Sequence, residues 1–91
     1  MRETVKQGDG CVVKQDGEIV AEITYVPQGE DTLVIDHTYV DPSMRGQKLA
    51  EELVRQVVEE ARATNKKIVP ACSYAYALFM RKKEYGDVWR Q

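Results

Sequence analysis

The stretch of sequence that most clearly suggests chemistry opens the longest helical pattern of the chain and reads Arg45-Gly46-Gln47-Lys48-Leu49-Ala50. The first backbone N–H groups of a helix lack intrahelical acceptors and carry partial positive charge, so they bind anions, phosphate above all. Gly46 has no Cβ and lets a ligand approach the backbone, while Arg45 and Lys48 would oppose phosphate charge directly. The pattern favours an anion site over its alternative, a solvated helix start that carries two unrelated cations.

Two further side chains have chemically reactive groups. Cys72 lies between a strand pattern and a helix pattern, and a helix N-terminus stabilises the thiolate form of a cysteine. The alternative is a small buried hydrophobic residue, a common state of free cysteine, and this is what we expect of Cys11. His37 is the only histidine and could act as a general base near neutral pH, although a strand histidine can equally be structural.

We expect three strands in the part of the chain before the loop at Arg45. Residues 10–26 read as two strands joined by a turn at 15–17, where Asp-Gly favours positive φ. Residues 27–31 read as a second turn and 32–40 as a third strand, whose apolar residues on both faces indicate a central position. The alternation in the second strand predicts one buried face, made of Ile19, Ala21, Ile23 and Tyr25.

The helix that follows Ser43 is the clearest element, and Asn65 is its expected end. Its predicted buried stripe consists of Leu49, Leu53, Val57 and Ala61, with Ala50, Val54 and Val58 beside it. Residues 67–73 then read as a short strand, so a crossover with parallel pairing is expected. Residues 74–83 read as a second helix with Ser73 as N-cap, and Val88 and Trp89 of the tail are expected to pack back onto the sheet. This order predicts an α+β fold with helices covering the sheet.

Composition narrows the class of protein. The 91 residues suggest one domain over 1–91, and 43% hydrophobic with 31% charged residues is typical of a soluble globular protein. A net charge of −2 gives no general attraction to nucleic acid. The chain has no apolar run that could cross a membrane and no signal-peptide core, so we expect a cytoplasmic protein. Two cysteines far apart and one histidine argue against a metal site and a disulfide.

The segment "IDHTYVDPSMRGQKLAEELV" resembles the acetyl-CoA-binding segment of the GNAT superfamily of N-acetyltransferases. The signature of that superfamily is Arg/Gln-x-x-Gly-x-Gly/Ala at the start of a long helix. Arg45 matches the first position and Ala50 the last, whereas Lys48 stands at the fourth position, where a glycine is expected. A small single-domain GNAT-like group of about this length is more similar still, because it shares a "DHT-x-V" strand, an "RGQG" loop and a cysteine at the position of Cys72. The resemblance covers roughly residues 10 to 88.

The resemblance implies a minimal GNAT fold, in which antiparallel hairpins lead into a strand–helix–strand crossover and the parallel strands around Val40 and Val69 splay apart. It implies transfer of an acetyl group from acetyl-CoA to a primary amine. The pyrophosphate would rest on the amides of residues 46–50, and the pantetheine arm would lie along the strand that ends near Val40. A backbone N–H of Thr38, Tyr39 or Val40 would polarise the thioester carbonyl.

The resemblance also assigns individual roles. Cys72 would face the thioester, either as a nucleophile or as a group that orients the acetyl. Tyr74 would protonate the departing thiolate and Tyr76 would contact the cofactor, while aromatic packing is the alternative for both. The matched strand makes His37 a candidate general base. Lys48 is expected to point outward with its ammonium on a CoA phosphate, although its β-carbon could instead crowd the pyrophosphate.

The short chain gives a last expectation about the acceptor. It lacks sequence for the additional helices and strands that usually build the acceptor pocket, which suits a protein tail or another bulky amine. Two other hypotheses are a non-enzymatic module that binds acetyl-CoA or CoA, and a small protein-interaction domain without a ligand.

Overall fold

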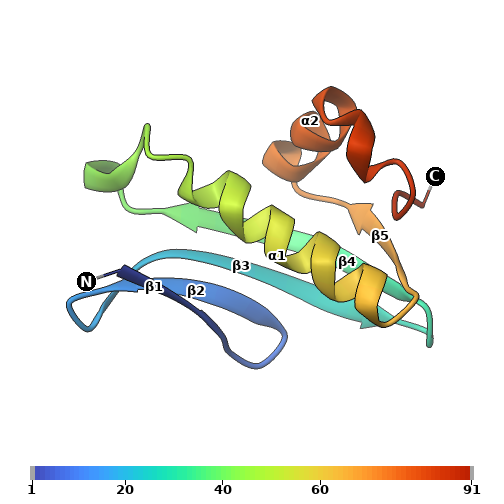
Figure 1. The fold of residues 1–91 in the computed structure, drawn as a ribbon, viewed down its shortest axis with the longest axis horizontal. Coiled ribbons are helices and arrows are strands. Elements are labelled where there is room, and N and C mark those ends of the chain that lie inside the picture. The colour runs from blue at the N-terminus through green and yellow to red at the C-terminus, as the bar shows by residue number, and fades with distance from the viewer. Residues whose placement is uncertain (1, 91) are drawn as a thin grey trace.

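A single five-stranded sheet and two helices make up residues 2–90, the part of the chain that the computed structural model describes. The strands lie in the sequence order β1-β2-β3-β4-β5; the first four are antiparallel, and β4 and β5 are parallel. The elements are β1 (Arg2–Lys6), β2 (Gly10–Gln15), β3 (Glu18–Gln28), β4 (Thr32–Val40), α1 (Leu49–Ala63), β5 (Lys67–Pro70) and α2 (Ser73–Arg81). The structure confirms the predicted α+β crossover, and β4 lies between β3 and β5, although β5 pairs only with its first half (Figure 1).

The hairpin between β2 and β3 forms as predicted. Asp16 and Gly17 both have positive φ, 52° and 87°, which matches the right-handed twist of the strands in a two-residue turn. Gly10 is required nearby, because a Cβ there would overlap the carbonyl oxygen of Ile23 on the neighbouring strand.

Three strand boundaries differ from the sequence prediction. β1 is an additional strand, and the pattern missed it because four of its five residues are exposed at the sheet edge. β3 continues through Pro27 to Gln28, so the second turn is confined to residues 29–31. β5 ends at Pro70 rather than at residue 73.

The predicted buried face of β3 is wrong at Ile19, which is 45% exposed. The pairing register shifts between β2 and β3, so that Lys14 faces Ile19 and Val13 faces Ala21. Val20 is the extra residue of this bulge and is buried in place of Ile19. Ala21, Ile23 and Tyr25 are buried as predicted.

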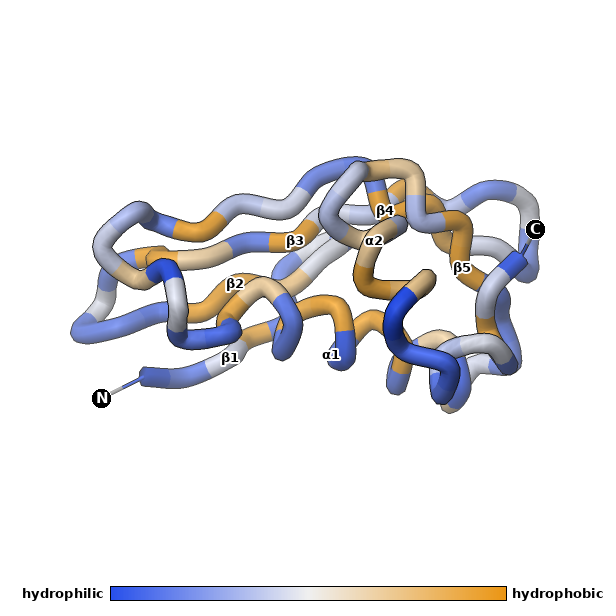
Figure 2. Tube along the Cα trace, turned by 90° about the horizontal axis from the view of Figure 1, so that it is seen from above, coloured by the Kyte–Doolittle hydropathy of each residue, from blue (hydrophilic) through white to orange (hydrophobic). Residues whose placement is uncertain are grey.

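The core lies on one face of the sheet. The predicted stripe of α1 is buried over β2, β3, β4 and β5, and α2 packs against β4 and β5 on the same side (Figure 1). Figure 2 shows hydrophobic segments along the strands and along both helices, interrupted by hydrophilic ones. Val88 is 3% exposed and Trp89 pairs with Ile68, which confirms that the tail packs back onto the sheet.

Two details of α2 correct the prediction. Its N-cap is Cys72, whose sulfur accepts a hydrogen bond from the N–H of Ala75, while Ser73 is already the first helical residue. The helix ends at Arg81, and a short 3-10 turn follows at Lys83–Tyr85. No helix in the described part of the chain has the length and apolar character needed to cross a membrane.

Candidate active site

The parallel strands β4 and β5 separate halfway along β4. β5 pairs only with Thr32–Ile35, and the N–H groups of Ala71 and Cys72 both donate to the Ile35 carbonyl (2.9 and 3.1 Å) as the chain turns into α2. A register shift also leaves Asp36 as an extra residue of β4 opposite β3. Beyond this point no strand of the described residues pairs with residues 36–40 of β4 on the β5 side, which confirms the predicted splay.

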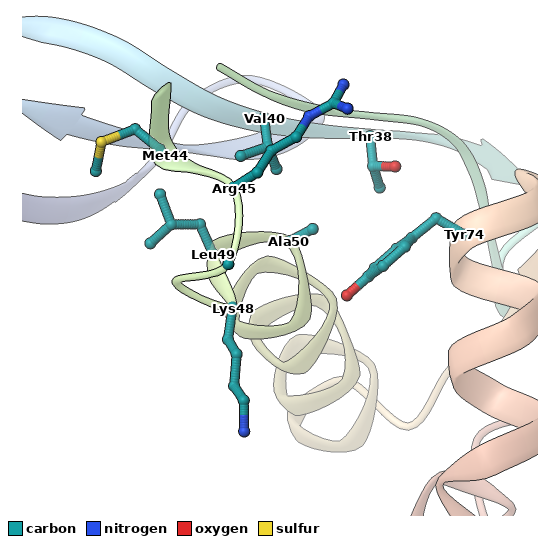
Figure 3. A pocket seen from close by; sticks show the side chains of 9 residues that line it. Thr38, Val40, Met44, Arg45, Lys48, Leu49, Ala50 and Tyr74 are labelled. Atoms are coloured by element: carbon teal, nitrogen blue, oxygen red, sulfur yellow. The ribbon is translucent and has the colours of Figure 1, made fainter. Parts of the chain in front are cut away.

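A cleft of about 350 Å³ lies beside the separated part of β4, between the start of α1 and the start of α2 (Figure 3). This volume is at the lower end of the range of small-molecule sites. Its lining combines Thr38 and Val40 of β4, Tyr74 of α2, and the connecting loop with the first turn of α1, namely Met44, Arg45, Gly46, Lys48, Leu49 and Ala50. The structure thus brings eight of the predicted site residues to one cleft, seven predicted to bind the cofactor and Tyr74.

The loop from β4 to α1 is held by its own side chains. The Asp41 carboxylate accepts hydrogen bonds from the N–H and the hydroxyl of Ser43 (2.9 and 2.7 Å), which lower the pKa of Asp41. Met44 is 7% exposed and anchors the loop in the core. The sequence reasoning missed Met44 as a cleft residue, although a single apolar residue between polar turn residues is a usable signal for such an anchor.

The first turn of α1 is uncapped. Its N-cap residue Lys48 makes no side-chain cap, and the N–H groups of Leu49, Ala50 and Glu51 donate to no other described residue. The N–H of Glu52 is the first to be bonded, to the carbonyl of Lys48 at 3.1 Å. Free amides beside a cationic loop are the features that a phosphate group requires, so the residues present fit the pyrophosphate of CoA.

Lys48 has a left-handed backbone conformation with φ 60° and ψ 28°. Glycine adopts this conformation without strain, which gives a conformational reason for the glycine that the resemblance expects here. Gly46 also has positive φ, 90°, and an added Cβ there would meet no other atom. Figure 3 shows the Lys48 side chain leaving the loop on the side away from Arg45, whose guanidinium extends toward Thr38.

Cys72 is half-buried at the splayed end of β5. Its sulfur accepts a hydrogen bond from the N–H of Ala75 at 3.4 Å and lies 3.8 Å from the Thr38 hydroxyl oxygen. Thr38 lines the cleft and Cys72 does not, so the thiol lies behind the Thr38 side chain. This arrangement fits a thiol that faces or orients a thioester, and it equally gives the sulfur a role in capping α2.

The Tyr74 ring reaches from α2 toward the first turn of α1 (Figure 3). Partial burial, followed by the negative charge of Glu51, raises the pKa of Tyr74 above its ordinary value. The phenol therefore keeps its proton at neutral pH and is available as a donor inside the cleft.

His37 and Tyr39 lie on the other face of β4. Thr38 pairs with the fully buried Ile23 on the helix-covered face, and successive side chains of a strand alternate, so both flanking side chains point away from α1. Both are exposed, and no hydrogen bond joins His37 to Cys72 in the described part of the chain.

Two other predicted residues lie outside the cleft wall. Tyr76 packs edge-on against Trp89, with ring centroids 6.0 Å apart. Gln47 accepts a hydrogen bond from Arg2 of β1 at 2.7 Å and lines a second cleft on that side. No group of three His, Cys, Asp and Glu side chains within residues 2–90 is arranged to hold a metal ion.

Comparison with known proteins agrees with this geometry. A family model described as GCN5-related N-acetyl-transferase matches residues 11–88, and the chain therefore belongs to the GCN5-related N-acetyltransferase (GNAT) family. A protein of Staphylococcus aureus solved by NMR, described as GCN5-like, is 31% identical with a TM-score of 0.81; the match covers 97% of this chain and 87% of that one. No curated protein matches the sequence.

More distant solved structures share the fold. The ribosomal-protein-S18-alanine N-acetyltransferase of Escherichia coli is 20% identical with a TM-score of 0.65, over 82% of this chain and 53% of that protein. N-acetylglutamate synthase of Neisseria gonorrhoeae, solved with coenzyme A and N-acetyl-glutamate, is 16% identical with a TM-score of 0.60, over 66% and 15%. This chain thus corresponds to about half of the first protein and a small part of the second.

Proposed function

We propose that this protein is an N-acetyltransferase that moves the acetyl group of acetyl-CoA to a primary amine. The observation that carries the proposal is the cleft itself, where the uncapped start of α1 and the unpaired edge of β4 meet. The first can bind a pyrophosphate, and the second can hydrogen-bond an extended amide chain such as pantetheine. Membership of the GNAT family supports the same assignment.

Binding would use the groups that the structure leaves free. Arg45 forms no ion pair with another described residue, so its guanidinium is available to a phosphate. The amides of Leu49 and Ala50 would share the charge of the pyrophosphate. The acetyl group would then lie near Thr38 and Cys72, where β4 and β5 have separated.

Transfer itself forms one bond and breaks one. The neutral amine nitrogen attacks the thioester carbon, the carbon–sulfur bond breaks, and the amine loses a proton while the CoA sulfur gains one. A backbone N–H of residues 38–40 stabilises the oxyanion, and Tyr74 donates the proton to sulfur. His37 is the proposed base, and because its side chain lies on the face away from α1, the amine would approach from that face.

Two variants test these roles. His37→Ala should lower turnover while acetyl-CoA affinity stays unchanged, and unchanged turnover would remove the histidine from the mechanism. Tyr74→Phe should lower turnover in the same way, because it keeps the ring in the cleft and removes only the proton donor. Both are measured by release of free CoA thiol.

Cys72 offers a second route, in which the thiolate takes the acetyl group and passes it to the amine. Mass spectrometry of the protein after incubation with acetyl-CoA, without an amine, would detect an acetyl adduct on Cys72. Absence of the adduct together with full activity of Cys72→Ala would establish direct transfer.

We propose that the acceptor is a protein or another bulky amine. On the face away from α1, exposed residues of β3 and β4 include Val26, His37 and Tyr39, and the two clefts described here lie elsewhere. A small amine would need a concave pocket for tight binding, whereas a peptide can bind to an open face. Turnover with lysine peptides should exceed turnover with small amines at equal concentration; the reverse order would contradict a bulky acceptor.

The alternative function is a module that binds acetyl-CoA without transferring the acetyl group. Lys48 at the glycine position of the family pattern is the specific feature that favours it. Titration with acetyl-CoA, followed by the thiol-release assay with polyamines, small amines and lysine peptides, separates the two. Binding without turnover on every amine would support the module.

A further inference from the structure

A second cleft adjoins the first on the other side of Lys48. It has a volume of about 340 Å³ and shares Lys48 and Leu49 with the first cleft, while β1, β2, α1 and the loop before α1 supply the other walls. These walls are Arg2, Thr4, Val13, Gln47 and Glu52. Two of its lining side chains are cations and one is a carboxylate, so its charge is positive on balance.

The single carboxylate of this cleft is already engaged. Glu52 accepts hydrogen bonds from Arg55 at 2.8 Å and from Gln56 at 3.1 Å, which outweigh burial and lower its pKa. Lys48 has no ion-pair partner among the described residues, and Glu51, whose carboxylate feels the Lys48 charge, is paired with Lys82 at 2.8 Å. The Lys48 ammonium is therefore free to meet an anion.

Arg45 and Lys48 do not converge on one point. Figure 3 shows their side chains leaving the loop in opposite directions, with Arg45 toward β4 and Lys48 away from it. Arg45 lines only the first cleft, whereas Lys48 lines both. A single phosphate group at the start of α1 would be contacted by Arg45, which leaves Lys48 for a second and separate anion.

CoA carries two separate anionic groups, the pyrophosphate and the 3′-phosphate of its ribose, several bonds apart. We propose that the second cleft binds the 3′-phosphate of acetyl-CoA, with Lys48 and Arg2 as its cationic contacts and Gln47 holding Arg2 in place. Gln47 accepts from Arg2 at 2.7 Å, which fixes the guanidinium beside the loop. The lysine at the family's glycine position then has a ligand of its own. This inference rests on the proposed function, because it presumes that acetyl-CoA is the ligand.

The test compares acetyl-CoA with acetyl-3′-dephospho-CoA by isothermal titration calorimetry. The parent protein should bind acetyl-CoA about 10- to 100-fold more tightly, as expected for one or two charge-assisted contacts. Lys48→Ala should reduce this ratio about tenfold, and Lys48→Arg should restore it. Arg2→Ala, at a strand position that needs no special backbone conformation, should also lower the ratio. Lys66→Ala is the matched control and should leave it unchanged.

Two results would overturn the 3′-phosphate site alone. Equal affinity of the parent for the two ligands, or a ratio that survives both Lys48→Ala and Arg2→Ala, would overturn the 3′-phosphate site while leaving acetyl-CoA binding intact. Failure of the parent protein to bind either ligand would overturn the proposed function and this inference with it.

Discussion

The two helices begin on either side of the same cleft, and their first turns are built differently. At α1 the N-cap residue Lys48 is left-handed and caps nothing, so three amides have no partner within residues 2–90. At α2 the N-cap residue Cys72 is extended and its sulfur accepts the N–H of Ala75. One helix start is left free for a ligand, and the other is closed by the protein.

This difference separates two tasks. An uncapped helix start is less stable than a capped one, by about 1 kcal/mol, and that loss is recovered when an anion binds. A capped start is fixed in the absence of ligand, so α2 holds Tyr74 and Cys72 in place before binding. Under the proposed function, the start of α1 would bind the cofactor and the start of α2 would position side chains beside it.

The largest effect, on acetyl-CoA affinity, is expected from reversing the charge of Arg45 beside the uncapped start of α1. Arg45→Glu places a carboxylate where the account puts pyrophosphate, and acetyl-CoA affinity should fall by about 100-fold or more. Calorimetric titration measures this loss. Lys66→Glu makes the same charge change away from the cleft and should alter affinity only slightly; an equal loss in both variants would mean that net charge alone governs binding.

Removing the cap of α2 should have a smaller effect, on stability. Cys72→Ala deletes the acceptor for Ala75 and should lower the free energy of unfolding by about 0.5–1 kcal/mol. Cys72→Ser restores a better acceptor at the same position and should be at least as stable as the parent. Urea denaturation of the three proteins decides this, and similar losses in both variants would show that the sulfur contributes packing rather than a cap.

Relieving the left-handed residue at α1 should stabilise the fold slightly. Lys48→Gly removes the backbone strain at positive φ, but glycine also has more conformational freedom in the unfolded chain. The net increase in the free energy of unfolding should be about 0.5 kcal/mol. Lys48→Ala keeps the strain and should gain nothing. Asn65→Gly, at φ 58°, should gain less than Lys48→Gly because asparagine tolerates this conformation. A gain from Lys48→Ala as large as from Lys48→Gly would exclude backbone strain as the cause.

The smallest effect concerns the ion pair that joins the two helices. The hydrogen bond from Lys82 outweighs partial burial and lowers the pKa of Glu51 in the first turn of α1. Because the folded-state pKa is lowered, the pair stabilises the fold above the unfolded-state pKa, and this contribution disappears as pH falls through the folded-state value. An NMR titration of the Glu51 side chain should show a pKa below that of a free glutamate, and Lys82→Ala should raise it. A value that does not respond to Lys82→Ala would assign the shift to another group.

Much of this arrangement was predictable because it depends on local pattern. The apolar stripe of α1, the Asp16-Gly17 turn and the cationic loop at Arg45 are encoded within a few residues, and each forms as expected. The resemblance to GNAT proteins then supplied the splay of β4 and β5, which no short-range pattern determines.

What could not be predicted depends on strand register and on neighbours distant in sequence. Val20 replaces Ile19 in the core because a bulge between β2 and β3 changes which side chain points inward. Alternation along β4 separates His37 from Cys72, although the sequence reasoning grouped both as catalytic. The sequence predicts Ser73 as the N-cap of α2, because a serine hydroxyl is the better acceptor in isolation. In the structure the chain turns after Pro70 and places the Cys72 sulfur at the N-cap position instead.

The proposed function requires that the free amides at the start of α1 bind the pyrophosphate of acetyl-CoA. Titration of the ¹⁵N-labelled protein with acetyl-CoA, followed by amide NMR shifts, tests it most directly. The account predicts large saturable shifts for Gly46, Leu49, Ala50 and Glu51, and a much smaller shift for the capped amide of Ala75. Saturable binding that shifts Ala75 and leaves the amides of α1 unmoved would contradict it.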